Sequence, residues 1–385
     1  MHIGRGEGKD MNSDDFFQSK KPWSHYKDMI LGYYLKPYLT KVCSLGKSVV
    51  VFDCFAGPGR FEDGADGSPL IIAKAIRQVT DKGKTVSAIF IEEKKKYFQI
   101  LQATIKDYQD ICQPRHESFQ KSAKDIASVG RHNNVFVYID PYGIKSLRFD
   151  ILAEIYANIA KGSSVEVLLN FNASSLVRNG LAALKCNQQD ENEELPDMTM
   201  TPSDIDTIAG GAYWRDIVTS NISFSEKEEQ CVVAYMQMMK KYFDEVCCYS
   251  IKEKNDKIPK YRLLFGSRHP DAFILMNDAI CNARDEFLGK QYVEGKLVDM
   301  RSEDEIHDPQ RLQQAIFDSL TTSMTRKKLI LCAMHKVFAE YKESEYKRMI
   351  SSLLKDEKIL SESGKARIND KEVLSPNISF NGCQK

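Results

Sequence analysis

The fold of this chain is decided by residues 49–61, which read Val49-Val50-Val51-Phe52-Asp53-Cys54-Phe55-Ala56-Gly57-Pro58-Gly59-Arg60-Phe61. The first four side chains are apolar and mostly β-branched, a pattern typical of a strand covered on both faces in an α/β sheet. Gly57 and Gly59 then break the strand, because glycine tolerates positive φ and lets the backbone approach a ligand closely. A strand, a Gly-x-Gly loop and a helix form the usual crevice for a nucleotide-like cofactor. We therefore interpret the stretch as a cofactor loop, with an ordinary turn as the alternative.

The helix after this loop starts late, because residues 62–69 intervene before an apolar helical pattern resumes over 70–79. Ser68 is the expected N-cap, with Pro69 at the first helical position.

Acidic residues follow the next predicted strand, 85–91, which ends in Glu92 and Glu93. In doubly wound folds an acid at the end of the second strand accepts hydrogen bonds from ribose hydroxyls. Strand alternation does not choose between the two acids, and we favour Glu92. A weaker third strand over 111–117 would bring Glu117 or Ser118 to its carboxyl end.

A second informative motif follows the apolar strand predicted over 135–139, which stops at Asp140-Pro141-Tyr142-Gly143. A carboxylate fixed at a strand end beside an aromatic ring suits a planar, amine-bearing ring, because the carboxylate accepts from the amine while the aromatic side chain stacks. A simple β-to-α turn is the alternative, since Asp, Pro and Gly all form turns.

The rest of the sheet predicts the fold class. A fifth strand over 165–171 ends in Asn170-Phe171-Asn172, and strands over 246–252 and 260–266 form a hairpin. The helix before the hairpin is expected over 225–243, with Ser225 and Glu228 as its capping box. Five alternating β/α units closed by a hairpin indicate an α/β, Rossmann-like class I methyltransferase sheet, mostly parallel with an antiparallel closing hairpin.

Three regions are expected along the chain: an N-terminal helical extension over 1–45, a Rossmann-like domain over 46–300, and a C-terminal winged-helix-like α+β domain over 305–370. The first 20 residues are polar and predicted to be frayed, and the tail from Asn369 is predicted to be loose. An acid-rich insertion at about 185–206 is predicted to be a mobile, solvated loop.

The helix predicted over 23–42 carries an aromatic stripe that we expect to pack on the sheet. The alternative interpretation puts the polar side chains of Lys20, Lys21, His25 and Lys27 at the rim of the cofactor crevice.

Composition narrows the class of protein. Lys plus Arg equals Asp plus Glu at 54 each, so any nucleic-acid surface must be local. No run is long and apolar enough to cross a membrane. The ten cysteines are scattered without metal-ligand spacing, so we expect no metal and a reducing, cytoplasmic environment.

With these elements in place, the sequence resembles the three-Cys-motif partner (TcmP) family, bacterial proteins related to S-adenosylmethionine-dependent methyltransferases. The matching residues are Trp23, Lys27, Tyr33-Tyr34-Leu35-Lys36-Pro37-Tyr38, Phe55-Ala56-Gly57-Pro58-Gly59-Arg60-Phe61-Glu62-Asp63-Gly64, Gly67-Ser68-Pro69, Asp140-Pro141-Tyr142-Gly143 and Leu263-Leu264-Phe265-Gly266-Ser267-Arg268-His269-Pro270. The Asp140 tetrapeptide is also similar to the Asp-Pro-Pro-Tyr and Asp-Pro-Phe-Gly signatures of enzymes that methylate exocyclic amines of nucleic-acid bases. It departs from the first of these in having one proline before the aromatic residue, not two.

The resemblance implies S-adenosylmethionine as cofactor, a three-Cys-motif partner similar to radical S-adenosylmethionine enzymes, and DNA or RNA as the substrate. The implied cofactor-binding residues are Asp53, Phe55, Ala56, Gly57, Gly59, Glu92, Glu117 and Ser118, and the implied catalytic residues are Asp140, Pro141 and Tyr142.

Two alternatives to an enzyme that methylates a base amine stay open. The chain could be a non-catalytic partner whose crevice is vestigial and whose C-terminal region binds nucleic acid or protein. A nuclease is the third interpretation, because Glu62, Asp63 and Asp66 could gather a magnesium ion. Acids in a glycine-rich loop are more often turn residues.

Overall fold

One sheet of seven strands dominates the protein, whose computed structural model describes residues 17–186, 200–251, 259–294, 308–365 and 368–377. The strands are β1 (Val49–Asp53), β2 (Val86–Glu92), β3 (Cys112–His116), β4 (Asn134–Ile139), β5 (Val165–Phe171), β6 (Glu245–Ile251) and β7 (Tyr261–Ser267). They lie in the order β3-β2-β1-β4-β5-β7-β6. β1 to β5 are parallel, and β7 is antiparallel to both β5 and β6. This topology confirms the predicted Rossmann-like methyltransferase sheet.

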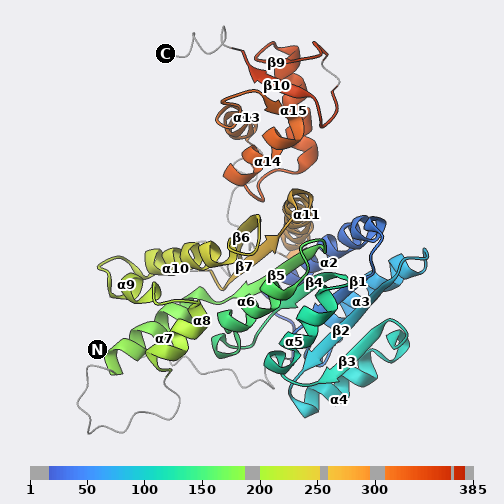
Figure 1. The fold of residues 1–385 in the computed structure, drawn as a ribbon, viewed down its shortest axis with the longest axis vertical. Coiled ribbons are helices and arrows are strands. Elements are labelled where there is room, and N and C mark those ends of the chain that lie inside the picture. Colours follow the sequence, from blue (N-terminus) through green and yellow to red (C-terminus); the bar gives the residue numbers. More distant parts are fainter. Residues whose placement is uncertain (1–16, 187–199, 252–258, 295–307, 366–367, 378–385) are drawn as a thin grey trace.

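Helices cover both faces of this sheet (Figure 1). They are α2 (Pro22–Val42), α3 (Ser68–Thr80), α4 (Lys95–Thr104), α5 (Phe119–Gly130), α6 (Phe149–Asn158), α7 (Ala173–Cys186), α8 (Pro202–Ala209), α9 (Trp214–Thr219), α10 (Phe224–Met239) and α11 (Pro270–Glu294). Val49 and Val51 pack into one core with α2, α3 and α11, whereas Val50 and Phe52 pack into a second core with α5, α6 and α10. The alternation of side chains along β1 thus explains why all four residues are apolar.

The predicted N-terminal cap of α10 is wrong. The helix α10 is capped by Ser223 and Glu226, not by Ser225 and Glu228. The Glu228 side chain is instead fully buried and pairs with Arg262 on β7.

The acid-rich insertion is ordered helix in part, contrary to the predicted loop. Thr201 and Asp204 form a capping box at the start of α8, and Asp206 accepts a 2.8 Å hydrogen bond from the Trp214 indole. Residues 187–199, the rest of that prediction, lie outside the described residues.

The C-terminal unit, residues 308–377, has its own small sheet (Figure 1). It contains α13 (Pro309–Phe317), β8 (Met324–Thr325), α14 (Arg326–Lys336), α15 (Glu343–Lys355), β9 (Ile359–Ser361) and β10 (Val373–Pro376). The predicted loose tail is wrong for β10, which lies between β8 and β9 and pairs antiparallel with both. The winged-helix assignment stays a prediction. No helix in the described part of the chain is long and apolar enough to span a membrane.

Buried polar contacts hold the C-terminal unit on α11. The Asn277 amide donates to the Tyr341 carbonyl at 2.8 Å and accepts from the Ala339 N–H at 2.8 Å. Ala339 has a positive φ of 62°. Arg284, which is 1% exposed, donates to the carbonyls of Ala339 and Glu340. These contacts satisfy backbone groups that the tight connection between α14 and α15 would otherwise leave unpaired.

An Asn277→Ala variant is expected to lower the free energy of unfolding by about 2 kcal/mol, because it leaves a buried donor and a buried acceptor unsatisfied. Urea unfolding measures this loss. Asn158→Ala is the matched control, since its exposed amide bonds only within α6, and it should change stability by less than about 0.5 kcal/mol. Equal losses in the two variants would contradict the role given to Asn277.

Candidate active site

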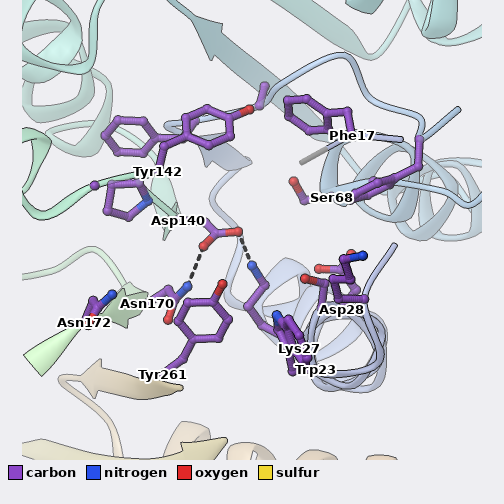
Figure 2. A pocket seen from close by; sticks show the side chains of 18 of the residues that line it. Phe17, Trp23, Lys27, Asp28, Ser68, Asp140, Tyr142, Asn170, Asn172 and Tyr261 are labelled. Atoms are coloured by element: carbon purple, nitrogen blue, oxygen red, sulfur yellow. Dashed lines mark hydrogen bonds and ion pairs between the residues drawn. The ribbon is translucent and has the colours of Figure 1, made fainter. Parts of the chain in front are cut away.

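The predicted motifs meet at the carboxyl ends of β1, β4 and β5, where they line a cavity of about 300 Å³. The N-terminal end of α2 and the start of β7 complete its wall. Figure 2 shows Asp140, Asn170, Lys27 and Tyr261 pointing toward one another across this cavity. The cavity also lies where the strand order turns from β3-β2-β1 to β4-β5, the usual position of ligands in open α/β sheets.

The glycine loop has the backbone that only glycine adopts readily. Gly57 and Gly59 have positive φ values of 62° and 79°. The Gly57 N–H donates to the Glu92 carboxylate at 2.8 Å, and the Lys94 N–H donates to the other carboxylate oxygen at 2.7 Å. Glu92 is 3% exposed, and burial is the main reason that its pKa is raised. Of the two acids after β2, Glu92 therefore faces the loop, whereas Glu93 is exposed.

Asp53 lies beneath the loop at the end of β1 and is fully buried. The Ser68 hydroxyl donates to its carboxylate at 2.6 Å, and the Phe55 N–H donates at 3.4 Å. Burial raises the pKa of Asp53 to about 7, and these two hydrogen bonds offset part of that rise. Ser68 is thus not the predicted N-cap of α3; Gly67 takes that position, and the Ser68 hydroxyl faces Asp53.

The raised pKa of Asp53 predicts a pH-dependent stability. The folded protein holds this proton more tightly than the unfolded chain, whose carboxyl has the ordinary pKa of 3.8. The free energy of unfolding therefore falls as pH rises from about 4 to about 7. Asp53→Asn should reduce the fall between pH 4 and pH 8 by roughly 2–4 kcal/mol, measured by urea unfolding at both pH values. An unchanged pH profile would contradict the buried, protonatable carboxyl.

Asp140 is held from two sides in the cavity. Lys27 on α2 forms an ion pair with one carboxylate oxygen, and the Asn170 amide donates to the other at 2.7 Å. The Lys27 side chain is 5% exposed, and its ammonium lies 5.8 Å from the centre of the Tyr261 ring. Burial alone would lower the pKa of Lys27, but the carboxylates of Asp140 and Asp28 outweigh it and raise that pKa. Lys27 is therefore protonated at neutral pH.

Two further side chains shape the same end of the cavity. The Asn170 side-chain oxygen is buried and has no hydrogen-bond partner among the described residues. Tyr142 is 44% exposed, and its ring meets the ring of Phe17 edge-on, with 5.7 Å between centroids. The cavity thus offers an unused acceptor and an accessible aromatic ring.

The structure brings together only part of the predicted site. The predicted residues that line the cavity are Phe55, Ala56, Gly59, Asp140, Pro141 and Tyr142. Those that lie outside its lining are Asp53, Gly57, Glu92, Glu117 and Ser118. Glu117 lies 3.7 Å from Arg115, and the Ser118 carbonyl accepts from the Ser122 hydroxyl. The geometry therefore gives neither residue a contact with the cavity.

Sequence reasoning missed several cavity residues. It favoured Lys27 as part of a packing helix and assigned Asn170 no role, because their contacts with Asp140 span 113 and 30 residues. The prediction that the first 20 residues are frayed is wrong at the end of that segment, since Phe17 and Lys20 are buried against the glycine loop. A polar residue at the end of the apolar β5 was the only signal for Asn170.

The acidic residues Asp63 and Asp66 of the loop insertion make structural contacts with neighbouring basic residues. Asp63 accepts from the Lys20 N–H at 2.8 Å, and Asp66 pairs with Lys74 and Arg60. Across the described ranges, no three His, Cys, Asp or Glu side chains form a group that could hold a metal ion.

Comparisons with known proteins give structural similarity only. No protein-family model matches the sequence, and no curated protein matches it. The chain is similar to Aeropyrum pernix fibrillarin with natively bound S-adenosyl-L-methionine, at 9% identity over 63% of this chain and 76% of that chain, with a TM-score of 0.31. It is similar to the O-methyltransferase from Bacillus cereus in complex with SAH, at 11% identity over 66% and 94%, with a TM-score of 0.32. Spermidine synthase from Thermotoga maritima gives 11% identity over 74% and 68%, with a TM-score of 0.33. The resemblance to the TcmP family stays a prediction.

Proposed function

We propose that this protein is an S-adenosylmethionine-dependent methyltransferase that acts on an exocyclic amine of a nucleic-acid base or a related substrate. The observation that carries the proposal is the position of Asp140. Its carboxylate lies in the cavity at the end of β4, directly beside the glycine loop of β1 at the switch point of the sheet. An acceptor for an amine and a loop for a nucleotide-like cofactor therefore share one small space.

The residues around the glycine loop fit such a cofactor. Gly57 and Gly59 give the loop its positive-φ backbone, and the buried Asp53 carboxylate with the Ser68 hydroxyl suits the ammonium group of a methionine moiety. Glu92 suits ribose hydroxyls, since each carboxylate oxygen can accept a second hydrogen bond. When bound, S-adenosylmethionine would supply an electrophilic methyl group on a sulfonium.

Asp140, Lys27 and Asn170 would orient the acceptor. Lys27 pairs with one oxygen of Asp140, and the carboxylate can accept a further hydrogen bond from an N–H of the substrate. The unpaired Asn170 oxygen would accept from the second N–H of a primary amine, which removes the cost of a buried, unsatisfied acceptor. Tyr142 offers its exposed ring for stacking on the base. Asp140, whose carboxylate lines the cavity, would receive the proton that the amine loses.

One observation favours a second function, that of a non-catalytic partner. The cavity of about 300 Å³ is at the small end of ligand sites, and a transfer reaction must hold two ligands. In that case the crevice is vestigial, and the C-terminal unit binds nucleic acid or the proposed three-Cys-motif protein similar to radical S-adenosylmethionine enzymes.

The two functions are separated by a transfer assay. The purified protein is incubated with S-adenosylmethionine carrying a deuterated methyl group and with single-stranded DNA, duplex DNA or RNA, and the nucleosides are then analysed by mass spectrometry. We expect label on an exocyclic amine, and more on single strands, because a base in a duplex must first be flipped out. Absence of label from every nucleic acid would favour the non-catalytic partner.

A further inference from the structure

A short segment at the start of the described chain is fastened across the glycine loop. We define residues 17–21 as the strap. The Phe17 carbonyl accepts from the Glu62 N–H at 2.9 Å, and the Lys20 N–H donates to Asp63 at 2.8 Å. The Lys20 ammonium reaches the Asp66 carbonyl at 2.5 Å and pairs with Asp28 at 2.6 Å. The insertion that delays α3 therefore serves as the anchor of the strap.

The ring of Phe17 occupies the face of Gly57 that glycine leaves open. A Cβ atom at Gly57 would lie 2.9 Å from the tip of the Phe17 ring and 3.1 Å from the Tyr142 hydroxyl. The ring also contacts Tyr97 and Phe61 edge-on or tilted, with centroids 4.8 and 5.6 Å apart. Figure 2 shows Phe17 and Tyr142 meeting over the loop. The protein's own aromatic side chains thus fill the place where close approach of a ligand is expected.

The same packing closes the ribose side of the crevice. Glu92 is 3% exposed, and both of its oxygens already accept from backbone N–H groups of the loop region. The open space lies on the other side, toward Asp140, and amounts to about 300 Å³. Glu92 does not line that space, and Phe17 and Tyr142 cover Gly57, whose N–H donates to Glu92.

We propose that the strap gates the crevice: the cofactor enters and leaves only when Phe17 lifts from Gly57 and the strap separates from residues 61–66. This inference rests on the proposed function for the identity of the ligand. The strap is suited to opening, because it is a segment of only five residues and its anchor residues Glu62 and Asp63 are exposed. Phe17 is a positioning residue, since it acts on the loop.

Hydrogen exchange tests the opening without any ligand. The amides of Lys20 and Glu62, which close the strap, should exchange at least ~100 times faster than the amide of Val51 in β1, because they need only local opening. Exchange of all three at one common rate would mean that the strap opens only with global unfolding, and would overturn the inference.

Stopped-flow binding of S-adenosylhomocysteine tests the gating. Trp23, one of the two tryptophans of the chain, lines the cavity and reports binding by fluorescence. Phe17→Ala should raise the association rate constant at least ~10-fold, because a larger fraction of molecules is open. Asp63→Ala, which frees the Lys20 N–H but keeps the Phe17 ring, should raise it less. Lys74→Ala is the control, since it removes an exposed pair to Asp66 and leaves the contacts between strap and loop intact.

The outcomes separate the two proposals. Faster association in Phe17→Ala and Asp63→Ala, with Lys74→Ala like the wild type, supports the gate. Binding to all four proteins with one association rate overturns the gate and leaves the proposed function standing. No binding of S-adenosylhomocysteine to any of them overturns the cofactor assignment and the gating role together.

Discussion

An Asp140→Ala variant is expected to bind S-adenosylhomocysteine within about threefold of the wild type and to lose methyl transfer by about 100-fold or more, the usual contribution of a positioned acid or base. Asp140 lies at the acceptor end of the cavity and makes no hydrogen bond with the glycine loop residues 55–59. Removal of the Asp140 carboxylate should therefore leave cofactor binding unchanged and weaken the binding and orientation of the substrate amine. Calorimetry measures the first effect, and the mass-spectrometric transfer assay measures the second.

The variant also leaves the buried Lys27 ammonium without its main partner. Breaking a buried ion pair by removing one member costs about 3 kcal/mol or more of stability. A double variant, Lys27→Met with Asp140→Ala, should recover part of that stability but none of the transfer. Asp150→Ala is the control, because it removes an exposed carboxylate paired with Arg148. Transfer at the wild-type rate in Asp140→Ala would remove this residue from the mechanism.

A Gly57→Ala variant is expected to weaken S-adenosylhomocysteine binding by about 30-fold, or roughly 2 kcal/mol. Gly57 has a φ of 62°, and an added Cβ would stand within 3.1 Å of both Phe17 and Tyr142. The added methyl group projects from the loop into the space where the cofactor is expected to approach the loop backbone closely. Calorimetric titration of the variant and the wild type measures the difference.

Gly64→Ala is a matched control within the same loop. Gly64 also has a positive φ, 87°, but nothing lies within 4 Å of the position of its Cβ. Both variants carry the backbone strain of a non-glycine residue in the left-handed region, about 1–2 kcal/mol. Only Gly57→Ala adds the clash. Equal binding by the two variants would show that the Gly57 face is not part of a ligand site.

The sheet could be predicted from sequence because most of its strands have a recognisable local pattern of apolar residues. β1, β4 and β5 are mostly apolar runs that stop at polar or glycine-containing turns, and the spacing of the hairpin β6–β7 indicates the antiparallel closure. β10 was missed because it is only four residues long, contains Ser375 and Pro376, and has a single fully buried side chain, Leu374, so that pairing with β8 and β9 defines it. Local pattern therefore predicts long buried strands and fails for short strands that their pairing defines.

The site was harder to predict because its contacts join distant parts of the chain. The motif around Asp140 was visible, whereas its partner Lys27 lies 113 residues away on a helix whose aromatic stripe suggested simple packing. Arg268 is an example of an architectural role. It lies in a stretch that resembles the TcmP family, and its guanidinium donates to the carbonyls of Tyr156 and Tyr242 and ties α6 to the segment after α10. In the sequence alone, a polar residue that supports the fold cannot be told from one that acts in a site, because the partners of both become visible only in the folded structure.

The central claim, that the crevice beside Asp140 binds S-adenosylmethionine, is tested most directly by calorimetric titration of S-adenosylhomocysteine into the wild-type protein. We expect one site per chain with a dissociation constant in the micromolar range, about −8 kcal/mol, that weakens in Gly57→Ala and persists in Asp140→Ala. Absence of binding at about 1 mM ligand, where even a −4 kcal/mol site would be half filled, would contradict the account.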